Sequence, residues 1–177
     1  MLLSYTEPGT AAALFLAVLM FVAGLRKLRH PALYRQHIAS YRVVPPALLG
    51  AVSLPLGMLE CVTGVALLLP SLREYSAIAV ATLLTLYTAV MSIALLRGGA
   101  GIDCGCGPFW LRQPLSAWHI LRNLLLLPCL ALVTAAGTSI PEGSVAWGRT
   151  ALIAITAVAV YGYGEFLLAR DALLADD

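Results

Sequence analysis

Charged residues are scarce in this sequence. Lys, Arg, Asp and Glu make up 11% of its 177 residues, whereas an ordinary soluble domain carries about 25%. Hydrophobic residues make up 60%. So little charge excludes a soluble catalytic domain of any size, and the net charge of +2 does not indicate a nucleic-acid partner, because the basic residues cluster where a membrane protein places them. The composition predicts an all-α membrane protein in contact with the lipid bilayer.

Five apolar runs are candidates to cross the roughly 30 Å hydrocarbon core as helices that rise about 1.5 Å per residue. They cover residues 10–25, 46–69, 75–96, 118–136 and 145–168. The whole chain, 1–177, is therefore predicted to form a single domain, a bundle of five transmembrane helices, or of four if one run does not span. Residues 31–43 are too polar to span but carry apolar side chains at helical spacing, which predicts a short interfacial helix after the first span.

The distribution of Lys and Arg predicts the orientation. No basic residue precedes the first run, so it is expected to be a retained helix rather than a cleaved signal peptide. Five Lys or Arg residues lie between Arg26 and Arg42, against one near Arg73 and one near Arg149. The positive-inside rule then places the N-terminus outside, and the third connection and the C-terminal tail inside.

Cysteine is also scarce, with only four in the chain, yet two of them lie one residue apart in "GGAGIDCGCGPFW", residues 98–110. The glycines allow the tight backbone that a Cys104–Cys106 disulfide needs, and a strained disulfide is easily reduced. The pattern favours a redox-active pair. An inert turn and a metal site with Asp103 or His119 are alternatives, but a metal site of the usual kind needs three or four ligands.

The other two cysteines, Cys61 and Cys129, stand alone within predicted spans. A buried free cysteine usually packs in a core. The alternative is a second thiol pair that relays electrons from the first. If both helices start from the same face, the two residues differ in depth by about one helical turn.

Glu60 is an ionisable residue well inside a predicted span, where a charge is costly and often functional. It is expected to carry a proton or to pair with a basic residue such as Lys27 or Arg122; a pair that only fixes helix packing is the alternative. Arg122 is also the candidate cation that stabilises a thiolate of Cys104 or Cys106, although its side chain can equally extend to the interface.

Three aromatic residues, Phe109, Trp110 and Trp118, lie near the dithiol. They can flank a flat ligand such as a quinone, the one cofactor considered. Aromatic residues at this position are more often anchors at the membrane interface.

Several short motifs together carry a family resemblance. They are "GLRKLRHP" at 24–31, "YRVVP" at 41–45, Pro55 with "LE" at 59–60, "CGCG" at 104–107 and "RN" at 122–123. With these motifs, residues 20–130 resemble the MauE family of methylamine-utilisation membrane proteins, within the broader DoxX-like redox-associated group. The Cys-Gly-Cys element is the most specific of them. The family pattern usually continues Cys-Gly-Cys-Phe-Gly, whereas this chain reads Cys-Gly-Cys-Gly-Pro-Phe.

The resemblance implies a multi-pass inner-membrane protein for the processing, transport or maturation of the small (beta) subunit of methylamine dehydrogenase. It also implies a thioredoxin-like periplasmic partner, MauD, with which Cys104 and Cys106 would exchange disulfides. A periplasmic partner conflicts with a cytoplasmic dithiol. Either the orientation is inverted, or Cys61 and Cys129 carry electrons between the faces.

The leading hypothesis is therefore a membrane thiol-disulfide oxidoreductase that supports maturation of an exported partner. A chaperone or export scaffold without redox chemistry is a second hypothesis. A quinone-binding or small-molecule transport subunit, in which Glu60 matters more than the thiols, is a third.

Overall fold

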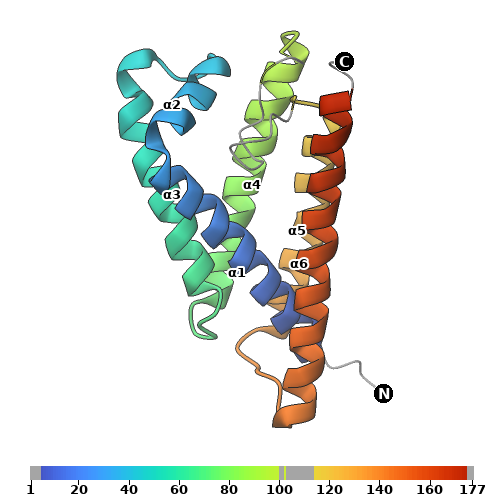
Figure 1. The fold of residues 1–177 in the computed structure, drawn as a ribbon. Helices are drawn as coiled ribbons and strands as arrows, with labels where there is room; N and C mark the ends of the chain where they lie inside the picture. Colours follow the sequence, from blue (N-terminus) through green and yellow to red (C-terminus); the bar gives the residue numbers. More distant parts are fainter. Residues whose placement is uncertain (1–4, 100–101, 103–113, 175–177) are drawn as a thin grey trace.

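The regular structure of the chain is helical (Figure 1), in a computed structural model that describes residues 5–99, 102 and 114–174. Within these residues the helices are α1 (Thr6–Arg29), α2 (Pro31–Ser40), the short 3-10 helix η1 (Pro46–Leu48), α3 (Leu49–Ala66), α4 (Arg73–Leu96), α5 (Ala117–Ala136) and α6 (Gly143–Leu174). Five are long and apolar enough to cross a membrane, with η1 and α3 counted as one. The predicted all-α fold with five long helices and a short one after the first is confirmed.

The helix boundaries differ from the predicted runs mainly at the ends. Helix α1 extends past residues 10–25 in both directions, because its polar terminal residues remain helical. Helix α2 ends at Ser40 rather than at residue 43, and Arg42 has a φ of 52°, outside the helical region. The second run begins as η1 and is α-helical only to Ala66, after which residues 67–69 form a turn.

Helix α1 is the centre of the bundle. It crosses the molecule obliquely and packs against α3, α5 and α6, while α4 packs against α3 and α5 (Figure 1). In its most apolar stretch, 56% of the residues are buried, against 11% in α6. The core joins side chains from several helices, and Leu16, Leu67, Val80 and Val133 are all fully buried in it.

Glycines allow α1 to approach its neighbours closely. A Cβ atom added to Gly24 would lie 2.6 Å from the carbonyl oxygen of Gly57 on α3. A Cβ atom added to Gly9 would lie 2.5 Å from the carbonyl oxygen of Leu132 on α5. Backbone atoms cannot be displaced cheaply, so only glycine fits at these crossings. Small residues at helix contacts are typical of membrane bundles, where backbones approach closely.

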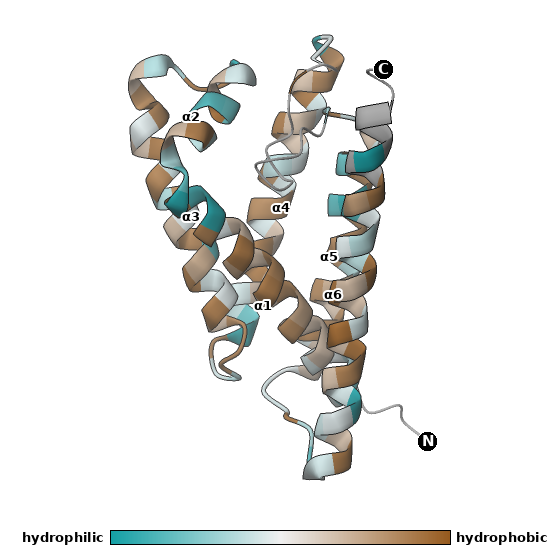
Figure 2. Ribbon diagram, in the orientation of Figure 1, coloured by the Kyte–Doolittle hydropathy of each residue, from teal (hydrophilic) through white to brown (hydrophobic). Residues whose placement is uncertain are grey.

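The two ends of the bundle differ in charge. We call one of them the basic end: it comprises α2, the C-terminal ends of α1, α4 and α6, and the N-terminal ends of α3 and α5 (Figure 1). Hydrophilic colour gathers there, and hydrophobic colour covers the middle of the bundle (Figure 2). The described Lys and Arg residues on its elements are Arg26, Lys27, Arg29, Arg35, Arg42, Arg97, Arg122 and Arg170.

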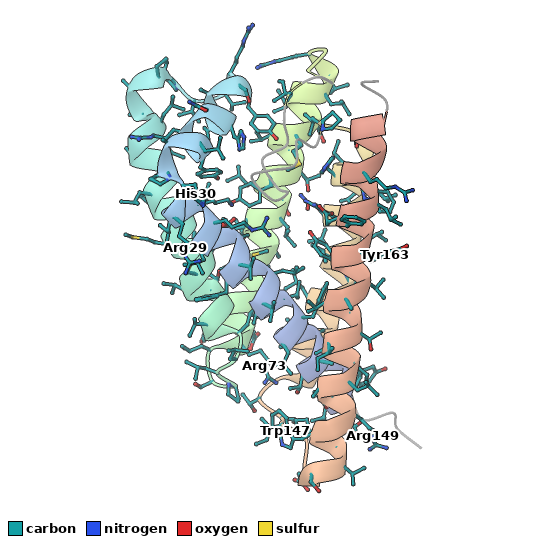
Figure 3. All side chains as sticks on the ribbon, in the orientation of Figure 1. Arg29, His30, Arg73, Trp147, Arg149 and Tyr163 are labelled. Atoms are coloured by element: carbon teal, nitrogen blue, oxygen red, sulfur yellow. The ribbon has the colours of Figure 1, made fainter. Side chains whose placement is uncertain are left out.

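The opposite end holds Arg73 and Arg149, the remaining basic residues of the described chain (Figure 3). Both are engaged. Arg73 is buried and its Nη1 donates to the carbonyl oxygens of Gly137, at 3.3 Å, and Ser139, at 3.1 Å. Arg149 forms an ion pair of 2.6 Å with Glu7. Of the described Lys and Arg residues, eight therefore lie at the basic end and two at the opposite end.

Candidate functional site

The predicted dithiol, Cys104 and Cys106, lies outside the described residues, as do Asp103, Phe109 and Trp110. The helices on either side of it are described. Helix α4 ends at Leu96 and α5 begins at Ala117, both at the basic end (Figure 1). The backbone N–H of Leu115 donates to the carbonyl oxygen of Ile102 at 2.8 Å. This bond ties together the two sides of the segment that carries the cysteines.

The start of α5, just after this segment, is firmly anchored. Leu115 is buried beside Met91 and Ala94 of α4. Ser116 caps the helix, and the Nδ1 atom of buried His119 lies 3.4 Å from the Ser116 backbone nitrogen and 3.2 Å from its hydroxyl. The sequence allows His119 as a metal ligand, whereas the structure uses one of its ring nitrogens in the helix cap. The motif is a capping box with His in place of Glu or Gln, which explains why the sequence analysis missed it.

Arg122 lies one turn further along α5 and is buried. Its Nη1 donates to Oε1 of Glu165 on α6 at 2.8 Å, its Nη2 is 3.5 Å from Oδ1 of Asn123, and its guanidinium carbon is 5.8 Å from the centroid of the Tyr161 ring. The guanidinium is thus directed to α6, to which it attaches α5. Its suggested action on a thiolate of Cys104 or Cys106 stays a prediction.

Glu60 is completely buried on α3, with 0% of its surface exposed. Its Oε1 atom accepts hydrogen bonds from Lys27 of α1 and from the hydroxyl of Tyr87 on α4. Lys27 also donates to the Tyr87 hydroxyl at 2.9 Å. Of the two basic residues predicted as possible partners of Glu60, Lys27 is the one that pairs with it in the structure.

Lys27 is enclosed by aromatic rings as well. Its Nζ atom lies 4.6 Å from the ring centroid of Tyr87 and 5.0 Å from that of Tyr34 on α2, distances at which a ring face attracts a cation. We call Lys27, Tyr34, Glu60 and Tyr87 the tyrosine-lined ion pair. It joins four helices, α1 to α4, and the two tyrosines gave no signal in the sequence.

The helix crossing explains why Lys27 meets Glu60. Gly24 and Gly57 touch where α1 crosses α3, and each precedes one of the charged residues by three positions. Residues three apart lie on the same helix face. A Cβ atom added to Gly57 would be 3.2 Å from the Lys27 Cβ. A glycine three residues before each charge is a signal that the sequence analysis could have used.

Comparisons with known proteins show the family of this chain. The family model described as "Methylamine utilisation protein MauE" matches residues 6–139, which include α1 to α5. The chain belongs to the MauE family. It is 37% identical over 153 residues to the Methylamine utilization protein MauE of Paracoccus denitrificans, covering 85% of this chain and 82% of that protein. It is 33% identical over 146 residues to the protein of the same name from Methylophilus methylotrophus, covering 80% and 75%. No solved structure matches it.

In this member of the MauE family, Cys61 and Cys129 are both free thiols. The Sγ atom of Cys61 lies 3.8 Å from the carbonyl oxygen of Phe21 on α1, next to Gly24. Cys129 on α5 packs against the central core. Helix α1 contacts both α3 and α5. The second thiol pair stays a prediction.

Proposed function

We propose that this MauE-family chain is an accessory protein of methylamine utilisation in the inner membrane, and that Cys104 and Cys106 exchange a disulfide with a MauD-like thioredoxin-fold partner. The exchange serves maturation of the small (beta) subunit of methylamine dehydrogenase. The observation that carries the proposal is the Cys-Gly-Cys pair in the connection between α4 and α5, in a chain whose relatives are named for methylamine utilisation.

The chemistry is a two-electron exchange. A thiolate of the reduced dithiol attacks a disulfide, a mixed disulfide forms, and the second thiol of the attacking pair releases it. One pair loses two electrons and two protons and becomes a disulfide, and the other pair gains them. The same steps run in either direction, so the step needs no reactant beyond the two cysteine pairs.

Two features of the described residues anchor the helices on either side of the segment that carries the cysteines. The Leu115–Ile102 hydrogen bond and the capped start of α5 anchor one side of the segment. On the other side, Tyr87 ties α4 to Glu60 and Lys27. A reactive pair gains precision when rigid elements support it.

The test is replacement of Cys104 or Cys106 by Ser in cells that produce methylamine dehydrogenase. We expect the disulfide-bonded beta subunit to be lost, measured by mass-shift alkylation, while the variants stay in the membrane at the wild-type level. Cys129→Ser in the same cells tests the second thiol pair: loss of maturation would support a relay through Cys129, and normal maturation would argue against it. Normal maturation in both Cys104→Ser and Cys106→Ser would instead favour the scaffold hypothesis. In the same cells, an impermeant thiol reagent separates the two routes to a periplasmic partner. Labelling of Cys104 from outside would mean direct exchange and an inverted orientation, and no labelling would require Cys61 and Cys129 to carry the electrons between the faces.

A further inference from the structure

A hollow of about 460 Å³ lies at the basic end, between the end of α2 and the end of α4. It is lined on one side by the end of α2 and the turn after it, and on the other by the end of α4 and the residues that follow: Ser40, Tyr41, Arg42, Ala94, Arg97, Gly98, Gly99 and Ile102. Its volume falls in the range of small-molecule sites, about 300–1,000 Å³. Among the described residues that line it, none carries a negative charge.

Two exposed arginines, Arg42 and Arg97, line this hollow. In the part of the chain that the structure describes, the side chains of Arg42 and Arg97 make no hydrogen bond or ion pair, whereas Arg122 and Arg149 each have a glutamate. An anion bound in the hollow would lie beside both cations, which favours its binding. The planar guanidinium suits phosphate oxygens in particular, because it donates in a fixed fork.

A second, apolar hollow of about 380 Å³ has one lining residue in common with the first. Val43, Val44, Pro45, Pro46 and Leu49 line it, and Arg42 lines both hollows. Arg42 is the one non-glycine residue of the described chain with a positive φ, 52°, where the chain turns after α2. This turn places a cation at the junction of a polar site and an apolar one.

We propose that the two hollows bind one anionic phospholipid, with its phosphate between Arg42 and Arg97 and an acyl chain along the apolar hollow. Helix α2 has no buried residue, as suits a helix at the membrane surface, where headgroups lie. Basic pockets at the ends of membrane helices bind anionic headgroups. The inference does not depend on the proposed thiol chemistry.

The test counts lipid bound to the purified full chain in detergent by native mass spectrometry, with phosphatidylglycerol as the probe. We expect one tightly bound phosphatidylglycerol. Arg42→Gln with Arg97→Gln should weaken it roughly thirtyfold, since each basic residue near the headgroups contributes on the order of fivefold. The single variants should each weaken phosphatidylglycerol binding roughly fivefold. They still test the proposal if the double variant does not fold.

Arg35→Gln is the matched control, because Arg35 is an exposed arginine of α2 that lines neither hollow. It should bind phosphatidylglycerol like the wild type. Equal binding by wild type and the folded Arg42/Arg97 variants would overturn the proposal. Displacement by glycerol phosphate at the same concentration would also overturn it, because the site would then take a soluble phosphate rather than a lipid.

Discussion

Two ion pairs lie inside the bundle, and they differ in depth and in the number of helices they join. In the tyrosine-lined ion pair, the side chain of Glu60 is 1% exposed and that of Lys27 is 13% exposed, and helices α1 to α4 all contribute. In the second pair, the side chains of Arg122 and Glu165 are 10% and 14% exposed and join α5 to α6.

The difference shows what each pair stabilises. Separation of α1 from α3 would leave the Glu60 carboxylate in an apolar interior, which costs several kcal/mol, so the first pair holds the crossing closed. Separation of α5 from α6 costs less, because Arg122 lies near the basic end and its long side chain can reach the interface. A third pair, Arg149 with Glu7, is open to solvent at the opposite end, where the Arg149 side chain is 63% exposed.

The largest effect is expected from Lys27→Met, which leaves the Glu60 carboxylate without its cation. The free energy of unfolding, measured by SDS titration in mixed micelles, should fall by about 3 kcal/mol. The variant Lys27→Met with Glu60→Gln is the control. It should recover more than half of the loss, because no uncompensated charge remains. If Lys27→Met alone unfolds like the wild type, the pair does not hold the crossing.

A smaller effect is expected from Glu165→Gln, which removes the charge but keeps a carbonyl oxygen for Arg122. Asn123 and the Tyr161 ring also stay beside the guanidinium. The same titration should show a loss of about 1 kcal/mol. A loss as large as that of Lys27→Met would show that the depth of the two pairs does not determine how much each stabilises the protein.

The smallest effect is expected from Arg149→Gln, because an exposed ion pair is screened by solvent and salt. The loss should stay below about 1 kcal/mol, and for the wild type a rise in salt concentration should mimic it. Arg73→Gln at the same end is the contrast, because Arg73 is buried and its loss frees the carbonyls of Gly137 and Ser139. Equal effects of the two substitutions would contradict this distinction.

Local sequence predicted the helices well and their ends less well. The apolar run 75–96 corresponds closely to α4, Arg73–Leu96, because no charged residue, proline or glycine interrupts it. The run 145–168 stops short of the end of α6 at Leu174, since a helix continues beyond the apolar stretch into polar residues. Hydropathy reports the apolar part of a helix and not its hydrogen bonds.

The candidate sites were predictable only in part. Glu60 stands out in the sequence because a carboxylate within an apolar run is rare. Its tyrosine partners did not stand out, because Tyr34 and Tyr87 lie far from Glu60 in the chain and fit the apolar patterns of their own helices. The choice between Lys27 and Arg122 was open until the crossing of α1 and α3 was known.

The sequence by itself determined that this chain forms apolar membrane helices with one strongly basic end, because hydropathy and charge act locally and add along the chain. Only the tertiary structure decided which charges meet. Glu60 pairs with Lys27 because Gly24 and Gly57 let two backbones touch, and Arg122 is left to Glu165 on α6. Helix crossings depend on contacts between distant segments, so no local pattern contains them.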